Sequence, residues 1–305
     1  MSKYKVCIYT VYYNRENEVD ESIQSLLDQS YDDFLVVAID DGSTDQTLKK
    51  LKKFSNDSRL KIISKANSGF VDSIKYAISL DESEYIAIHG SGDVSFPNRI
   101  SSQVEILEKK QNVGVVGCHY ISEDLVSKKH IEFSDISGLV VDVNKKLKKK
   151  NFLTHGEVMF RRNIYDRVGG YNTLFYYSQD YDLWLRMSKL TQFYIVPDFL
   201  YKRYVRADGV SGKVSKIIPQ QYLASFARTN EIAHSNDIKS VDLLFKGKDK
   251  IYSKRLIKLF FRSAIYGSVD DMNTALKFIK IECNPFLYIT FISIGTLIKP
   301  IKGLI

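Results

Sequence analysis

The fold of this chain is decided by the stretch Val36-Val37-Ala38-Ile39-Asp40-Asp41-Gly42-Ser43-Thr44-Asp45-Gln46-Thr47, in which an apolar run meets two acidic residues. The run 34–39 is rich in β-branched residues, which is typical of a strand buried on both faces of a parallel sheet. Ser43 followed by Gln46 predicts a capping box for a helix that runs to about residue 54. Open α/β sheets bind ligands beyond the carboxyl ends of their strands, so Asp40 and Asp41 are predicted to hold a polar molecule. The alternative is that both acids only cap the helix.

Composition indicates a globular protein. The chain has 305 residues, of which 44% are hydrophobic, enough for one large domain or two modest ones. Cys7, Cys118 and Cys283 lie far apart and indicate neither a disulfide framework nor a zinc site, so a reducing cytosol fits best. The N-terminus runs directly into a predicted strand, and we therefore expect a protein that is not exported.

The positive charge is confined to the last third of the chain. Residues 1–211 contain 29 Lys+Arg and 29 Asp+Glu, whereas residues 212–305 contain 15 and 7, so the whole net charge of +8 lies in the second segment. A neutral body without a recognisable module argues against nucleic-acid binding. We expect two parts: a neutral domain at 1–211 and a helical, basic region at 212–305.

Periodicity predicts alternating strands and helices. Strands are expected near 5–12, 34–40, 60–64 and 84–89, with helices near 17–29, 44–54 and 68–80. A helix from 97 to 110, a strand at 113–120, a strand at 156–161 and helices at 163–168 and 180–189 follow. The pattern weakens between 120 and 153, where the basic run 145–150 is interpreted as a loop or helix end, or a contact for an acidic substrate or lipid. The fold class is therefore α/β, with a mostly parallel sheet flanked by helices.

The C-terminal region is predicted to be helical. Residues 254–265 place cations on one stripe of a helix and apolar residues on another. The apolar segment 286–298 is too short to span a bilayer, but it could lie in the membrane interface. The alternative is that both segments form ordinary core. The basic stripe favours an anionic membrane surface bound through 250–300.

Four segments occur in a specific order along the chain. They read Thr10-Val11-Tyr12-Tyr13-Asn14-Arg15, Asp40-Asp41-Gly42-Ser43, Tyr85-Ile86-Ala87-Ile88-His89-Gly90-Ser91-Gly92-Asp93 and Ser178-Gln179-Asp180-Tyr181-Asp182-Leu183-Trp184-Leu185-Arg186. This order resembles glycosyltransferase family 2, which has the GT-A fold, over roughly residues 4–210. The resemblance implies inverting transfer of a sugar from a nucleoside diphosphate donor, and UDP is the nucleoside diphosphate that we expect. It also implies donor contacts from Thr10, Tyr12, Asn14, Arg15, Asp40, Asp41, Ser91 and Asp93.

The third segment departs from the family pattern. The family usually carries two aspartates, separated by one residue, that chelate a divalent cation; here Gly90 and Gly92 occupy those positions and Asp93 remains. A divalent cation, Mg²⁺ or Mn²⁺, is still expected on Asp93, because such an ion keeps waters and substrate phosphates as ligands. His89 either assists or is structural. Alternatively, glycine amides approach the diphosphate and Arg203 or Arg206 neutralises it.

The fourth segment contains the expected catalytic residue. The resemblance implies that Asp180 is the general base that takes the proton of the acceptor hydroxyl. A helix N-terminus would keep Asp180 ionised, although the same position suits a merely structural acid. Asp182 is expected to serve structure. Trp184 stacks on a sugar or belongs to the core.

Two further segments resemble parts of the family cleft. The strand that begins His155-Gly156-Glu157 resembles the one that approaches the acceptor. The segment Arg203-Tyr204-Val205-Arg206 with Ser211 resembles a flexible segment that closes over the diphosphate, or it is a surface loop with solvated arginines.

We therefore predict a cytoplasmic glycosyltransferase, either free or peripheral on the inner face of the plasma membrane, that acts on a polysaccharide or a lipid-linked oligosaccharide. A catalytically impaired nucleotide-sugar-binding or scaffold protein is the alternative, because the metal motif has lost its acids. A dinucleotide-dependent oxidoreductase is disfavoured, since no G-x-G-x-x-G follows the first strand.

Overall fold

A computed structural model describes residues 4–125, 127–206 and 214–229, together with Phe261, Asn273 and Leu276. The chain divides into two compact units, Met1–Val205 and Arg206–Ile305. Within the described residues, no helix combines the length and apolar character needed to cross a membrane. Apart from Phe261, the basic helix expected at 254–265 lies outside the described residues, as do Ser211 and the apolar segment 286–298.

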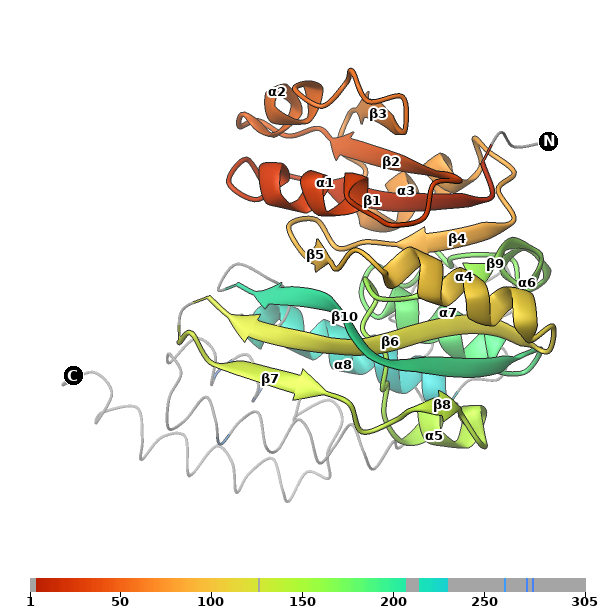
Figure 1. Ribbon diagram of the computed structural model, residues 1–305. Helices are drawn as coiled ribbons and strands as arrows, with labels where there is room; N and C mark the ends of the chain where they lie inside the picture. The colour runs from red at the N-terminus through yellow and green to blue at the C-terminus, as the bar shows by residue number, and fades with distance from the viewer. Residues whose placement is uncertain are drawn as a thin grey trace. The chain divides into compact units, whose positions relative to one another are not determined.

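The first unit is built on one ten-stranded sheet with the order β3-β2-β1-β4-β9-β6-β10-β5, to which β7 and β8 add at β6 and β10 (Figure 1). Its first four strands are parallel: β1 (Val6–Tyr12), β2 (Phe34–Asp41), β3 (Leu60–Lys65) and β4 (Tyr85–Ile88). All seven residues of β1 are buried, because helices cover both faces of the sheet. The α/β fold class and these four strands are confirmed.

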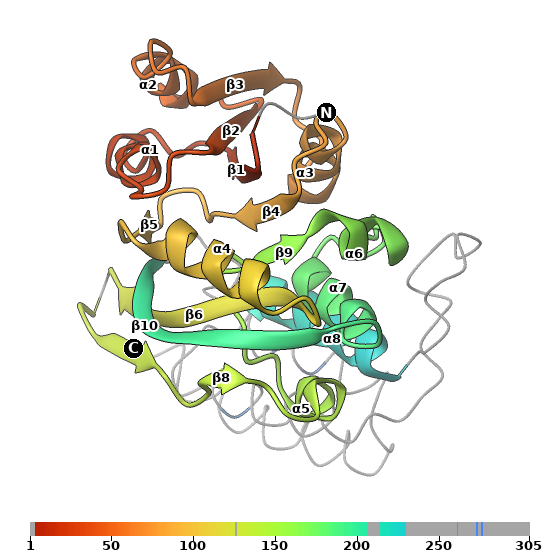
Figure 2. The same cartoon turned by 45° about the vertical axis from the view of Figure 1, so that its right-hand side comes forward.

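Helices cover the two faces of this parallel half. They are α1 (Val19–Leu27), α2 (Thr47–Lys52), α3 (Phe70–Ile78) and α4 (Arg99–Lys109). In Figure 1, α1 and α4 lie in front of the sheet and α3 lies behind it, and the turned view of Figure 2 agrees. α1 buries Val19, Ile23, Leu26 and Leu27, which share one helical face and join the apolar core.

The second half of the sheet is mixed. The long strands β6 (Val113–Asp124) and β10 (Gln192–Val205) are parallel to each other. The remaining strands run antiparallel to their neighbours: β5 (Val94–Ser95), β7 (His130–Phe133), β8 (Gly138–Leu139) and β9 (Met159–Arg161). Three helices accompany them: α5 (Val143–Lys149), α6 (Arg162–Arg167) and α7 (Gln179–Met187). The second unit contains α8 (Val214–Thr229).

β10 is absent from the strands that the sequence predicts. Its pairing with β6 shifts register between Gln192 and Phe193, between Val196 and Phe199 and again between Phe199 and Tyr201, so its side chains do not alternate with a period of two. A flexible segment or a surface loop was expected from Arg203 to Arg206. For residues 203–205 this expectation is wrong, because they end strand β10. The basic run 145–150 lies mostly on α5 and not on a loop.

The predicted capping box is also wrong. α2 begins at Thr47, and Gln46 at its N-cap makes no side-chain cap. Asp45 Oδ1 instead accepts a hydrogen bond from Thr47 N at 2.9 Å, while Ser43 Oγ accepts one from Asn14 N. Ser43 is therefore used to join two loops.

Candidate active site

Three loops meet at the carboxyl edge of the parallel strands. β1 pairs in parallel with β2 and with β4, which places Tyr12 opposite Asp40 and Tyr9 opposite Ile88. The loops that follow these strands consequently leave the sheet side by side. This is the edge at which the sequence predicted a polar ligand.

The loop after β1 docks onto the loop after β2. Asn14 has a left-handed backbone (φ 50°), donates its N–H to Ser43 Oγ at 3.0 Å and accepts a hydrogen bond from Thr44 N on its Oδ1 at 2.8 Å. Arg15 N donates to Thr47 Oγ1 at 2.7 Å. Both residues are half-buried, and the joined loops form one wall of the edge.

Two of the predicted donor contacts lie beneath this wall. Thr10 and Tyr12 are fully buried, and the Tyr12 hydroxyl lies 2.9 Å from Ser22 Oγ. Their side chains support the edge from within the sheet, and the donor contact predicted for these two residues stays a prediction.

Asp41 anchors the start of α3. Its carboxylate accepts hydrogen bonds from Lys65 Nζ (2.8 Å), Ser73 Oγ (2.6 Å), Ser68 N (3.0 Å) and Gly69 N (2.9 Å). Burial alone would raise the pKa of Asp41, but these donors outweigh it and hold the pKa below its ordinary value. With four donors committed to it, Asp41 has a structural role.

Asp40 is the less engaged member of the pair. It is buried, and it accepts two long hydrogen bonds, from Ser43 N and from Ser64 Oγ, each at 3.3 Å. A carboxylate has about four acceptor sites, so Asp40 retains capacity for a further donor. Of the two acids, Asp40 is the one that suits a ligand.

The loop after β4 is tied to β10 through Asp93. Asp93 Oδ2 accepts a hydrogen bond from the Tyr201 hydroxyl at 2.8 Å, and Oδ1 accepts one from Tyr204 N at 3.0 Å. The same Tyr201 hydroxyl accepts a hydrogen bond from Gly90 N at 2.9 Å. A Cβ atom at Gly90 would lie 2.2 Å from Asp93 Oδ2, so an acid at position 90 would require Asp93 to move.

His89 is a structural residue of this loop. Its Nε2 lies 3.2 Å from Ser22 Oγ and 3.0 Å from the Asp93 carbonyl oxygen, and its Nδ1 lies 3.2 Å from Ser95 Oγ. Burial, aided by the nearby positive charge of Arg99, lowers the pKa of His89 to about 3, so the ring is neutral. With both ring nitrogens engaged, the alternative that His89 assists a cation is wrong.

Asp93 fits a cation only as a single protein ligand. Within the part of the chain that the structure describes, no group of three or more His, Cys, Asp or Glu residues is arranged to hold a metal ion. Each oxygen of Asp93 accepts one of the two hydrogen bonds described above, and a carboxylate oxygen can accept a hydrogen bond and ligate a cation at the same time. Half-buried Ser91 completes the loop. These residues suit an ion whose other ligands are waters and substrate phosphates.

Asp180 lies in the first turn of α7, which follows the left-handed residue Ser178 (φ 56°). Its Oδ2 accepts a hydrogen bond from Asn151 Nδ2 at 3.2 Å, and the residue is half-buried. Asp180 is also near His155: burial lowers the pKa of His155, and the negative charge of Asp180 opposes that shift. The arrangement presents a carboxylate at a helix N-terminus beside a neutral imidazole.

Aromatic side chains surround His155. Its Nε2 lies 2.6 Å from the Tyr171 hydroxyl, and its ring meets Phe70 and Trp184 edge to face at centroid distances of 5.3 and 6.2 Å. Trp184 is fully buried, so the sugar-stacking role is corrected to a core role that supports His155 from below. Asp182 pairs with Arg186 inside the protein (2.6 Å) and serves structure, as expected.

Gly156 and Glu157 have different roles. A Cβ atom at Gly156 would lie 1.9 Å from the Tyr201 hydroxyl, so this position must remain glycine for β10 to approach. Glu157 is 1% exposed, and its Oε1 accepts a hydrogen bond from Thr154 N at 3.0 Å. Burial raises the pKa of Glu157 to about 8.

Arg203 is held on the side of β6. Its Nε donates to Ser122 Oγ at 3.0 Å, its Nη1 lies 3.4 Å from Thr154 Oγ1, and its guanidinium lies 5.6 Å from the centroid of the Tyr120 ring. Arg206 belongs to the second unit. The structure therefore brings Arg203 to the segment that contains Thr154 and Glu157.

Sequence reasoning missed Tyr201, Ser22, Lys65 and Asn151. Each acts through a partner distant in sequence, such as Tyr201 and Asp93, which are 108 residues apart. Of these four, Lys65 had a signal in the sequence. It follows a predicted strand that neighbours the one ending in Asp41, and parallel pairing places the two residues opposite each other.

Comparison with known proteins agrees with this geometry. The sequence profile of glycosyl transferase family 2 matches residues 7–169. EpsE of Bacillus subtilis (strain 168), provisionally named a glycosyltransferase, is 33% identical over 210 residues, covering 67% of this chain and 73% of EpsE. An uncharacterized glycosyltransferase of Haemophilus influenzae is 29% identical over 215 residues, covering 65% of this chain and 64% of that protein.

The fold also matches a solved structure. S. aureus TarS in complex with UDP-GlcNAc superposes with a TM-score of 0.63 at 17% identity, covering 91% of this chain and 81% of that one. The likeness extends the match in fold to most of the chain. Profile, relatives and fold agree, and the chain belongs to glycosyl transferase family 2.

Proposed function

We propose that this protein transfers a sugar, with inversion, from a nucleoside diphosphate donor to a hydroxyl of a polysaccharide or lipid-linked oligosaccharide. The observation that carries the proposal is the position of Asp180, a half-buried carboxylate in the first turn of α7, held by Asn151 beside neutral His155. Such a group can accept the proton of an attacking hydroxyl. UDP is the proposed carrier, supported by the likeness in fold to a protein solved with UDP-GlcNAc.

The donor would lie along the carboxyl edge of the parallel strands. Asp40 would accept a hydrogen bond from the base, because it retains acceptor capacity in a buried position. Asn14 and Arg15 would line the same wall, and the backbone around Ser91 would approach the diphosphate. Asp93 would hold a divalent cation, which when bound neutralises charge on the departing diphosphate.

The reaction then requires one base. The acceptor oxygen attacks the anomeric carbon from the side opposite the nucleotide while Asp180 removes its proton, and the bond from that carbon to the diphosphate breaks. The electron pair of that bond leaves with the nucleoside diphosphate. The product linkage is therefore inverted relative to the donor.

The lipid-linked acceptor and a peripheral position on the inner face of the plasma membrane rest on the sequence of 250–300 alone. The basic stripe in the sequence 254–265 supports this part of the proposal. Truncation after about residue 250 should abolish association with anionic liposomes, and retained association would contradict this part.

A thermal-shift panel tests the donor. UDP-, GDP- and dTDP-sugars are added at millimolar concentration with and without Mn²⁺, because a ligand that binds only the folded state raises the melting temperature. We expect UDP-sugars to give the largest rise. A melting temperature unchanged by every donor would contradict the proposed function.

The replacement of metal-binding acids by Gly90 and Gly92 favours a second candidate, a nucleotide-sugar-binding or scaffold protein without turnover. Donor hydrolysis or transfer that disappears in Asp180→Asn supports the enzyme. Donor binding without turnover on any acceptor extract supports the scaffold.

A further inference from the structure

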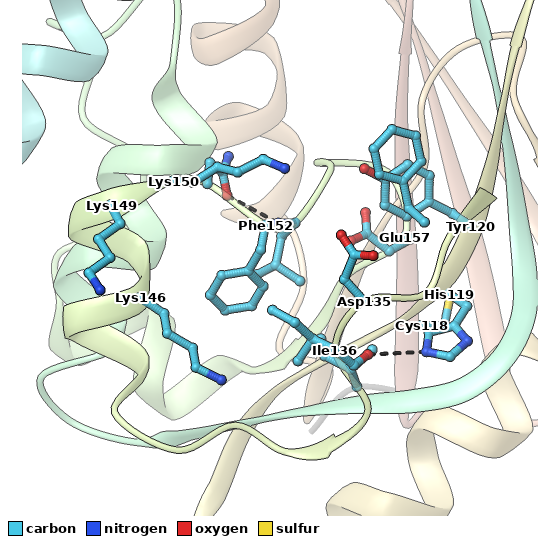
Figure 3. A pocket seen from close by; sticks show the side chains of 14 residues that line it. Cys118, His119, Tyr120, Asp135, Ile136, Lys146, Lys149, Lys150, Phe152 and Glu157 are labelled. Atoms are coloured by element: carbon cyan, nitrogen blue, oxygen red, sulfur yellow. Dashed lines mark hydrogen bonds between the residues drawn. The ribbon is translucent and has the colours of Figure 1, made fainter. Parts of the chain in front are cut away.

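A cavity of about 230 Å³ lies between β6, α5 and the segment 150–157 (Figure 3). Aromatic side chains, Tyr120, Phe133 and Phe152, form part of its wall. A concave site with an apolar wall and a few polar groups is the usual form of a small-molecule site. No role in the proposed donor site accounts for this cavity.

Glu157 forms part of the cavity wall and has an unmet hydrogen-bonding group. The residue is 1% exposed, its Oε1 accepts from Thr154 N, and its buried Oε2 has no hydrogen-bond partner among the described residues. An unpartnered buried oxygen is costly unless a ligand or water satisfies it. A protonated carboxyl both donates and accepts, which matches the two-way hydrogen bonding of a sugar hydroxyl.

The charges around the cavity are unevenly distributed. Lys146, Lys149 and Lys150 line it from α5 and the residue that follows, whereas Asp135 and Glu157 lie on the opposite side in Figure 3. None of these three lysines forms an ion pair with any acid in the described ranges. A ligand with a negative group at one end and hydroxyls at the other would therefore enter in one orientation.

One chain segment connects the cavity to the predicted base. Asn151 lines the cavity and donates from its Nδ2 to Asp180 Oδ2 at 3.2 Å. Leu153 N in turn bonds Asn151 Oδ1 at 3.2 Å, and Thr154 N bonds Glu157. A molecule that orders this segment would therefore also fix the position of Asp180.

We propose that this cavity is the acceptor subsite and that it takes a pyranose carrying an anionic group, a carboxylate or a phosphate. The proposal rests on the proposed transferase function. The anionic group faces the three lysines, the hydroxyls face Asp135 and Glu157, and the ring lies against the aromatic wall. The acceptor hydroxyl that reacts extends along the 151–154 segment toward Asp180.

Binding of small probes to the full-length protein tests the proposal. Methyl β-D-glucuronide and glucose 1-phosphate provide the two anionic groups, and methyl β-D-glucoside is the neutral match; each is titrated by calorimetry at low salt. The test variant is Lys146→Gln with Lys149→Gln. The control is Lys145→Gln with Lys148→Gln, which removes the same charge at the same spacing from α5, at exposed positions that do not line the cavity.

We expect at least one anionic probe to bind at least about tenfold more tightly than the glucoside. The test pair should remove that preference, and the control pair should change it less than about twofold. Preference for the glucuronide identifies a carboxylate, and preference for glucose 1-phosphate identifies a phosphate. Equal binding of all three probes, or equal losses in the two pairs, would overturn the proposal.

The thermal shift caused by the donor, measured on the same variants, separates failure of the acceptor inference from failure of the proposed transferase function. If UDP-sugars stabilise the protein and the probes show no preference, the acceptor inference fails alone. If no donor stabilises the protein, the proposed function fails whatever the probes do. Glu157→Gln keeps the shape of the protonated carboxyl and should retain probe binding, whereas loss of binding in this variant would contradict the role given to Glu157.

Discussion

The hydroxyl of Tyr201 lies 2.8 Å from Asp93 Oδ2, so the last acid of the glycine-rich loop is held by a strand 108 residues further along the chain. Tyr201 also accepts a hydrogen bond from Gly90 N, and it is fully buried. One side chain thus fixes both ends of the 90–93 loop. The shape of the proposed diphosphate site depends on β10 as much as on β4.

Tyr201→Phe should destabilise the protein by about 1 to 3 kcal/mol, because it leaves Gly90 N and Asp93 Oδ2 without this partner. Urea denaturation measures the change. Tyr204→Phe is the control, since the Tyr204 hydroxyl makes an exposed contact with Glu21 at 3.5 Å, and the substitution leaves the backbone N–H that bonds Asp93 unchanged. Equal stability of the two variants would mean that Tyr201 does not hold the loop.

Asp40→Ala and Asp41→Ala should have different effects on stability and on UDP binding, although the residues are adjacent. Asp41→Ala should lower the free energy of unfolding by roughly 2 to 3 kcal/mol. It breaks the ion pair of buried Asp41 with partly exposed Lys65 and removes the hydrogen bonds that hold the start of α3. Asp40→Ala should cost about 1 kcal/mol and weaken UDP binding about tenfold. Chemical denaturation and calorimetry with UDP separate these effects. Unchanged UDP affinity in Asp40→Ala would remove Asp40 from the donor site.

Asp180→Asn should lower the transfer rate by about 10²-fold or more, since the amide cannot take the hydroxyl proton. UDP-sugar affinity should stay within about twofold of wild type, because the change is isosteric. Asn151→Ala should lower the rate less, as it removes only the hydrogen bond to Asp180. Undiminished transfer by Asp180→Asn would assign the base elsewhere.

Chelation should weaken the donor complex without unfolding the protein. We expect EDTA to reduce the thermal shift caused by a UDP-sugar, and Mn²⁺ to restore it, because Asp93 supplies one ligand and the diphosphate supplies others. Asp93→Asn should abolish the response to Mn²⁺. A donor shift that is indifferent to EDTA would favour binding of the diphosphate by loop amides.

Glu157 should make stability fall as pH rises. Its pKa is about 8 in the folded protein, above the ordinary value of a glutamate, so its contribution is fully present below pH 4.5 and is lost as pH increases toward 8. The slope from this group is at most about 1.4 kcal/mol per pH unit. The free energy of unfolding of wild type, compared with Glu157→Gln between pH 5 and 9, should show this difference. Parallel curves would mean that Glu157 is ionised in the folded state.

Local pattern was enough to predict the parallel half of the sheet. β1 is a continuous apolar run because both of its faces are covered, and α1 and α3 have apolar residues at helical spacing because each buries one face. The register shifts of β10 remove that regularity, and the partners of Tyr201 cannot be read from residues near it in sequence.

The site residues were predictable by type and less so by role. Asp40 and Asp41 are adjacent and of the same type, yet Lys65 and the start of α3 donate hydrogen bonds to Asp41. Thr10, Tyr12 and Trp184 were predicted to contact a ligand, but their side chains lie inside the core. The cavity beside α5 arises from segments between 118 and 157 and one residue of β10, where the sequence pattern was weakest.

The hydrogen bonds from Tyr201 of β10 to the 90–93 loop also bear on the order in which the first unit can fold during synthesis. β1 to β4 are complete by residue 88, so the proposed nucleotide edge can form while most of the chain is still unmade. The 90–93 loop must wait for Tyr201, whose approach requires the bare backbone of Gly156 and pairing of β10 with β6. Closing contacts so distant in sequence is slow compared with local helix formation. The edge that contains Asp40 can therefore form well before the 90–93 loop is held in place, and the proposed donor site is complete only once the first unit is whole.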